Sequence, residues 1–163
     1  MMKRQVCKVA IMGIVGALPL LVPGTMRAQS QHSSDHPNTS AMNSFVAIFE
    51  IPATDMVRAV RFYEAILGLD IQQLEFDGLE MGLFPYENQA VTGVIMKGEG
   101  YEPSASGVTI YLNGGNDLQI VLNKVVANGG KVIVPKTPHA DESGFFALFS
   151  DTEGNKLGLH SPH

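Results

Sequence analysis

The fold is decided by a stretch of sequence that occurs twice in the chain. FVAIFEIPATDMVRAVRFYEAILGLDI, residues 45–71, lies over GVTIYLNGGNDLQIVLNKVVANGGKVI, residues 107–133, when the chain is set against itself with an offset of 62. Nine pairs over positions 46–84 are identical, Asp55 and Asp117 among them, where ordinary composition gives roughly two or three. We therefore predict that one supersecondary unit is duplicated.

Each copy has the pattern of a β-α-β-β-β unit. Residues 46–51 are rich in β-forming side chains and predict a strand. Asp55 can accept hydrogen bonds at the start of the helix that follows, and Gly68 permits the left-handed turn that ends it. The predicted apolar face of this helix is Met56, Ala59, Val60, Tyr63 and Leu67. The remaining predictions are strands over 69–76, 79–84 and 91–97 and, in the second copy, a strand over 108–113, a helix from Leu118 stopped by Gly129 and Gly130, and strands over 131–135, 145–150 and 155–160.

The first 43 residues differ in composition from the rest. Residues 1–28 have a basic start, a run of 15 uncharged residues and then small residues, which is the pattern of a secretory signal. The run is too short and too interrupted by Gly and Pro for a stable membrane span. Residues 29–43 are polar and predict a flexible linker. We therefore expect a bacterial protein that is exported to the periplasm or secreted, with one folded domain over 44–163.

Removal of the signal changes the charge balance. Residues 1–28 contain four of the 11 Lys and Arg and none of the 16 Asp and Glu, so the formal charge of −5 becomes 7 − 16 = −9. This acidic balance argues against a nucleic-acid partner, because phosphate binding needs a basic surface. The single Cys also lies in the signal, which excludes disulfides and thiol chemistry in the mature chain.

Three stretches, FEIPATDMVRAVRFYEAILGL, GGKVIVPKTP and FFALFSDTEGNKLGLHS, resemble the vicinal oxygen chelate superfamily of glyoxalase, bleomycin-resistance and dioxygenase-like proteins. The resemblance implies an α+β fold of two tandem β-α-β-β-β modules, residues 44–98 and 106–163, whose sheets form a cup. It also implies, for many members, a divalent metal held by side chains from the first and last strand of each module, which polarises vicinal substrate oxygens.

The positions that this resemblance assigns to metal ligands carry no donor atoms. They fall on Ile48 and Ile110 in the first strands, on Gly158 in the closing strand, and near Gly93 in the first module. A divalent ion needs several N or O ligands around one point. We therefore predict that the usual metal site is absent and that the protein holds no metal cofactor.

Three polar residues are the remaining candidates for a ligand site. Glu50 and His160 each lie two residues beyond a presumed ligand position, so each should share a strand face with it and point into the cup. A carboxylate and an imidazole there could share a proton or hold a polar ligand. His139 lies in the polar loop PKTPHADESG and could reach over the groove.

The leading hypothesis is an exported, metal-independent protein that binds a small molecule in the cup, with Ile48, Glu50, Ile110, His139, Gly158 and His160 as cup-facing candidates. One alternative is a metal-dependent enzyme with Glu50, His139 and His160 as unusual ligands. Another is a drug-sequestering protein of the bleomycin-resistance kind. The residues do not decide whether the protein is catalytic; a catalytic member would be a lyase or an oxygenase. A homodimer is compatible with the open sheet edges.

Overall fold

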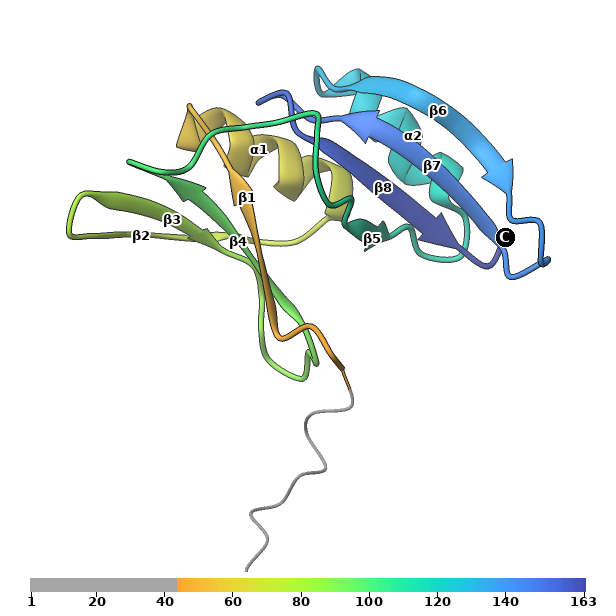
Figure 1. The fold of residues 1–163 in the computed structure, drawn as a ribbon, viewed down its shortest axis with the longest axis horizontal. Coiled ribbons are helices and arrows are strands. Elements are labelled where there is room, and N and C mark those ends of the chain that lie inside the picture. The colour runs from red at the N-terminus through yellow and green to blue at the C-terminus, as the bar shows by residue number, and fades with distance from the viewer. Residues whose placement is uncertain (1–43) are drawn as a thin grey trace, which may run out of the picture. The chain divides into compact units, whose positions relative to one another are not determined.

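Residues 44–163 form two four-stranded sheets, each with one helix, in the computed structural model, which describes these residues (Figure 1). The strand order is β1-β4-β3-β2 in the first sheet and β5-β8-β7-β6 in the second. In both sheets the first and last strands of the module are parallel neighbours and the other pairs are antiparallel. The elements are β1 Ile48–Pro52, α1 Met56–Leu67, β2 Gln72–Phe76, β3 Leu79–Leu83, β4 Thr92–Lys97, β5 Tyr111–Asn113, α2 Leu118–Ala127, β6 Lys131–Pro138, β7 Phe145–Ser150 and β8 Lys156–Ser161.

This arrangement confirms the predicted α+β fold with two β-α-β-β-β units. The predicted signal and linker, residues 1–43, lie outside the described residues. Within the part that is described, no helix is long and apolar enough to span a membrane.

The helix starts follow the prediction, and the end of α2 differs slightly. The Asp55 carboxylate accepts a hydrogen bond from the Arg58 amide, and Gly68 takes the left-handed conformation at φ 68°. Asp117 accepts from the Gln119 amide in the same way. The last turn of α2 is closed by Asn128, whose side chain donates to a backbone carbonyl of that turn, so the helix ends before the predicted glycines.

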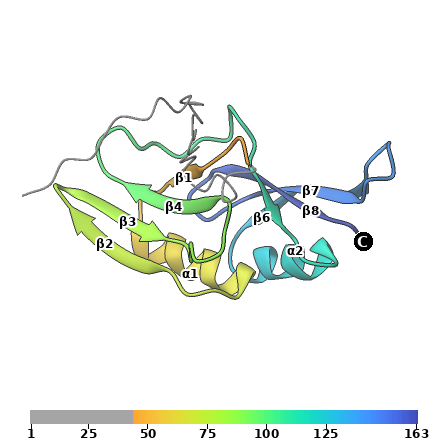
Figure 2. The same ribbon diagram turned by 90° about the horizontal axis from the view of Figure 1, so that it is seen from below.

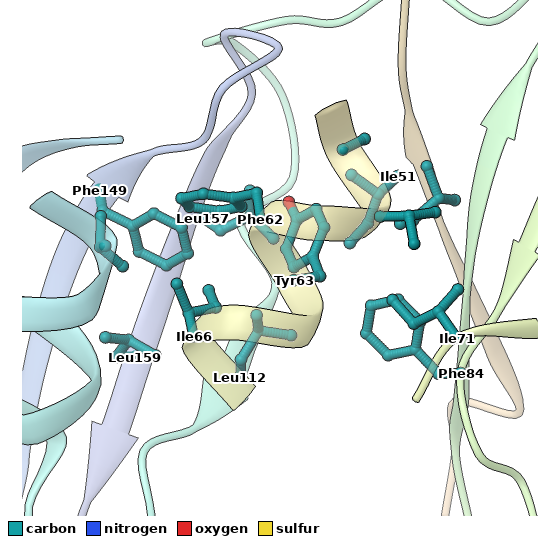
Figure 3. Packing of buried hydrophobic residues seen from close by; sticks show 14 of the residues in the cluster. Ile51, Phe62, Tyr63, Ile66, Ile71, Phe84, Leu112, Phe149, Leu157 and Leu159 are labelled. Carbon is teal, nitrogen blue, oxygen red and sulfur yellow. The ribbon is translucent and has the colours of Figure 1, made fainter. Parts of the chain in front are cut away.

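The buried face of α1 is wider than the apolar face predicted from the sequence. Phe62 and Ile66 are buried in addition to the predicted positions, whereas Leu67 is only half-buried. The reason is that α1 packs on both modules: Phe62 contacts Phe149 of β7 with ring centroids 6.3 Å apart. Figure 3 shows α1 between side chains of the first sheet, such as Phe84, and side chains of the second. The two helices also contact each other and lie side by side in Figure 2.

The two modules do not keep a constant offset of 62. The helix caps Asp55 and Asp117 are 62 residues apart in the sequence. The Ala53 amide donates to β4, and the Gly114 amide makes the equivalent hydrogen bond to β8. These two residues are only 61 apart. The difference arises because two residues separate β1 from its helix cap and three separate β5 from its own. The structural counterpart of Ile48 is therefore Thr109, and the predicted equivalence with Ile110 was wrong by one residue.

Strand β5 is shorter than predicted. It covers Tyr111–Asn113 only, and Val108, which was expected to begin it, is 87% exposed. Strand β6 is longer than predicted and contains two register irregularities. The first strand of the second module therefore leaves part of the module junction open.

Candidate functional site

A cavity of about 890 Å³ lies between the two modules. Its walls come from the end of α1, the start of β1 and β4, the edge of β5, and one side of α2. Volumes of this size accommodate drug-sized molecules. The large apolar side chains in the wall are Val46, Phe49, Ile66, Leu67, Leu69, Phe84, Val91, Ile110, Tyr111, Leu112 and Val121.

The polar side chains around this cavity are hydroxyls, amides and one ammonium group. Lys124 of α2 is the only charged residue among the described residues that line it. The Asn113 side-chain oxygen accepts a hydrogen bond from the Gly115 amide, which leaves its NH₂ group to face other partners. No Asp or Glu belongs to the described lining. The cavity can therefore offer hydrogen bonds and one positive charge to a bound molecule.

The opposite end of the module junction is closed by the turn 151–155, which follows β7. Asp151 is buried and accepts hydrogen bonds from the Tyr63 hydroxyl at 2.7 Å and from the Asn155 amide at 2.8 Å. The Asn155 side chain donates to the Pro52 carbonyl at 2.7 Å and so joins β8 to the end of β1. Burial, and then the negative charge of Asp151, raise the pKa of Tyr63 well above its usual range.

Glu153 adds an ionic contact to this closed end. Its carboxylate accepts from the Thr54 and Asp55 amides and from the Arg58 guanidinium, with Nε of Arg58 at 2.7 Å. Burial of Glu153 opposes ionisation, but the hydrogen bonds from Arg58, Asp55 and Thr54 outweigh it and lower the pKa of Glu153 to about 2. The ionised carboxylate therefore holds the start of α1 against the second module. We call the set Tyr63, Arg58, Asp151, Glu153 and Asn155 the clamp.

Glu50 and Ile110 line a second, smaller cavity of about 160 Å³ on the clamp side. Lys156 and Glu102 also face this space, so Glu50 has charged neighbours of both signs. Ile110 belongs to the walls of both cavities, whereas Ile48 belongs to neither and is 60% exposed.

The structure brings His139 and His160 together. Their ring centroids are 5.4 Å apart, and the His139 ring also lies 5.0 Å from that of Phe146. Neither histidine lines the large or the small cavity. Within residues 44–163, no three His, Cys, Asp or Glu side chains are grouped so that they could hold a metal ion, so Glu50 does not complete a site with this pair.

The comparison with known families identifies the fold's relatives. Residues 44–159 match the model of the Glyoxalase/Bleomycin resistance protein/Dioxygenase superfamily. The chain belongs to this superfamily. A glyoxylase-like domain-containing protein of Didymella fabae is 34% identical, over 65% of this chain and 84% of that protein.

Solved structures of superfamily members share the fold at lower identity. A glyoxalase I mutant from Zea mays is 20% identical with a TM-score of 0.59, and the match covers 71% of this chain and 45% of that one. This chain therefore spans less than half of the maize enzyme. An antibiotic binding protein, TnmS3 from Streptomyces sp. CB03234, is 23% identical with a TM-score of 0.57, over 74% of this chain and 97% of that one.

The metal site expected for many superfamily members does not fit this chain. Ile48, Ile110 and Gly158 supply no donor atom, and the structural counterpart of Ile48, Thr109, adds only a hydroxyl. Ile48 and Ile110 also differ in surroundings, because Ile48 is exposed and Ile110 packs against the core. The side chains at these positions supply no set of N or O ligands for an ion.

The two glycines at closing-strand positions are covered by aromatic rings. A Cβ atom on Gly158 would overlap the ring of Tyr111, its partner on β5. A Cβ on Gly93 would lie 2.6 Å from the ring of Phe49, its partner on β1. In this superfamily member, aromatic rings occupy the space that carboxylate side chains at these positions would need.

Sequence reasoning missed the clamp and, apart from Ile110, the residues that line the large cavity. Lys124 is the one basic residue on a helix whose other side chains are mostly apolar, which was an available signal. Glu153 and Asn155 were given no functional or structural contact, because their partners, Thr54, Arg58 and Pro52, are about a hundred residues away along the chain.

Proposed function

We propose that this chain is a metal-independent binding protein of the superfamily, which holds a small, largely apolar molecule in the cavity between its modules. The observation that carries the proposal is the cavity of about 890 Å³ itself, with its predominantly apolar wall. Burial of apolar ligand surface there would provide most of the affinity, at roughly 25 cal/mol per Å² before the cost of association.

Metal independence is supported by the residues at the ligand positions. Ile48, Ile110 and Gly158 have no donor atoms, and the Tyr111 ring covers Gly158. These residues offer a metal ion no ligands through which vicinal oxygens could be polarised, and the proposal therefore assigns the protein binding rather than that chemistry.

The proposal places the protein outside the cytoplasm. Its support is the sequence of residues 1–28, in which Lys3, Arg4 and Lys8 precede the uncharged run. Mass spectrometry of the protein from a periplasmic or culture-supernatant fraction should find a mature N-terminus near Gln29. An intact Met1 in the membrane fraction would contradict export with cleavage.

Native mass spectrometry and elemental analysis of the purified protein test the binding proposal together. We expect a co-purifying organic molecule, or saturable binding of apolar probes, with less than stoichiometric transition metal. Stoichiometric zinc, nickel, manganese or iron that is lost in Glu50→Ala or His160→Ala would contradict metal independence. The double variant Val91→Phe with Val121→Phe, which narrows the cavity, should abolish the organic ligand.

A further inference from the structure

The large cavity has a single charged residue in its described lining, and that residue is basic. The protein as a whole has more acidic than basic residues, and the predicted mature chain has a formal charge of −9. The described lining of the cavity nevertheless contains Lys124 and no Asp or Glu. The cavity is therefore a local exception to the acidic surface.

Lys124 is available for a ligand. The four ion pairs among residues 44–163 involve Arg58, Lys97 and Lys136, and none of them involves Lys124. Lys124 lies on α2 one turn after Val121, and both residues line the cavity. An ammonium group beside an apolar wall recognises a molecule that has a negative charge at one end.

Asn113 supplies a second donor at this cavity. Because its side-chain oxygen accepts from the Gly115 amide at 2.9 Å, the amide orientation is defined and the NH₂ group is the free end. No hydrogen bond from this NH₂ group occurs within the described part of the chain. An acceptor-rich group, such as a carboxylate or a sulfonate, suits both donors.

We propose that the cavity selects amphipathic monoanions: an aromatic or aliphatic body of drug-like size that carries one carboxylate or similar acidic group, bound by Lys124 and Asn113. The proposal rests on the proposed binding function and names the ligand class for that same cavity. A cationic drug is disfavoured as the ligand, since the described lining offers no carboxylate to pair with a cation.

A matched pair of fluorescent probes tests the charge preference. 8-Anilinonaphthalene-1-sulfonate and N-phenyl-1-naphthylamine share the same aromatic body, and only the first is charged. The wild-type protein should bind both in the cavity. Lys124→Gln should weaken the sulfonate probe about tenfold, as expected for one charge-assisted hydrogen bond, and should leave the neutral probe within about twofold. Lys124→Arg should restore most of the sulfonate affinity.

Two control variants define where the probes bind. Lys131→Gln removes an exposed lysine of β6 that does not line the cavity, and it should change neither affinity. Leu74→Ser removes an exposed apolar side chain of β2, and it should also change neither, which excludes that sheet face as the binding surface. Equal losses of both probes in Lys124→Gln, or no loss of the sulfonate probe, would overturn the monoanion proposal.

A different set of results would show that the cavity does not bind ligands at all. Val121→Phe fills space in the cavity wall and should weaken both probes; Val91→Phe, from the other module, serves if the first variant does not fold. If a folded variant of this kind binds both probes as tightly as the wild type, or if the wild type binds neither, the cavity is not the binding site. If both probes depend on the cavity and neither depends on Lys124, only the monoanion proposal fails.

Discussion

The two ends of the module junction differ in how they are closed. At one end, the turn 151–155 of the second module reaches the first module through Asp151, Glu153 and Asn155. At the other end, the corresponding turn of the first module, residues 85–91, lines the cavity and leaves it open. The modules have the same strand order, so the difference comes from the length and side chains of the two corresponding turns and not from topology.

The comparison shows how two modules of the same architecture can be closely joined at one end and leave a cavity at the other. At the clamp end, the buried Asp151 carboxylate and the partly buried Glu153 carboxylate accept hydrogen bonds from the first module, which holds the two modules together. The open end has Tyr86 and Val91 near the positions where the clamp has Asp151 and Asn155, so it lacks the acceptors that would close it. We expect mutations at the clamp to change the free energy of unfolding strongly, and mutations at the cavity to change it weakly.

Asp151→Ala should have the largest effect on this comparison. It removes a buried carboxylate that accepts from Tyr63 and Asn155 and leaves both donors unpaired. We expect a loss of about 3–5 kcal/mol in the free energy of unfolding, measured by urea denaturation with circular dichroism. Glu99→Ala, at an exposed acidic residue, is the control and should change stability by less than about 0.5 kcal/mol. Similar losses in both variants would mean that the clamp has no special role.

Glu153→Gln should destabilise the protein by about 2 kcal/mol at pH 7, the range for hydrogen bonds to a charged group. The effect depends on pH with a defined sign. Because the folded pKa of Glu153 is about 2, below its value in the unfolded chain, the stabilisation is present above about pH 5 and is lost as the pH falls toward 2. Denaturation curves of wild type and variant should converge over that interval. A difference that stays constant down to pH 2 would refute the ionic role of Glu153.

Tyr63→Phe should cost about 1–2 kcal/mol at neutral pH, since it removes one hydrogen bond to buried Asp151. The folded pKa of Tyr63 is raised, so its contribution is complete below the ordinary tyrosine value and declines as the pH rises past about 10. The wild type should therefore lose stability more steeply above pH 10 than the variant. Tyr86→Phe, at an exposed tyrosine, should leave the alkaline limb unchanged.

Two valines of α2 allow a closely matched comparison of core and cavity wall, with the smallest expected changes in the free energy of unfolding. Val125 is fully buried, whereas Val121 is half-buried in the cavity wall. Val125→Ala should cost about 2 kcal/mol, and Val121→Ala about 1 kcal/mol or less, because the second site already borders open space. Thermal unfolding of both variants measures the difference. Equal costs would show that the cavity is as well packed as the core.

The elements that could be predicted from sequence are those with local signals. Asp55 and Gly68 lie at the two ends of α1 and define it without reference to the rest of the chain. The β7 bounds 145–150 were predicted without error for the same reason, since an apolar run of strand-forming residues lies between polar turns.

The exact offset between the two modules and the contacts of the clamp could not be predicted. The offset depends on the length of each connecting segment, and the clamp depends on residues that are far apart in the sequence. One additional residue between β5 and Asp117 moves Thr109, and not Ile110, into the position equivalent to Ile48. The residues that bond to Glu153 lie in the other module, and no pattern in the sequence around Glu153 predicts them. Of the candidate site residues, Ile110 lines the large cavity, and Glu50 and Ile110 the small one, while His139 and His160 form a pair elsewhere.

The clamp also has a consequence for the order in which the chain can fold. The Asn155 side chain bonds to Pro52 across 103 residues, and Tyr63 bonds to Asp151 across 88. Closing loops of this length carries an entropic cost that must be met before the contacts form. Because Asp151, Glu153 and Asn155 lie between β7 and β8, a chain that emerges N-terminus first cannot close the clamp until most of the second module has emerged. Docking of the two modules through the clamp is therefore a late event in folding, because it follows synthesis of both helices and of seven of the eight strands.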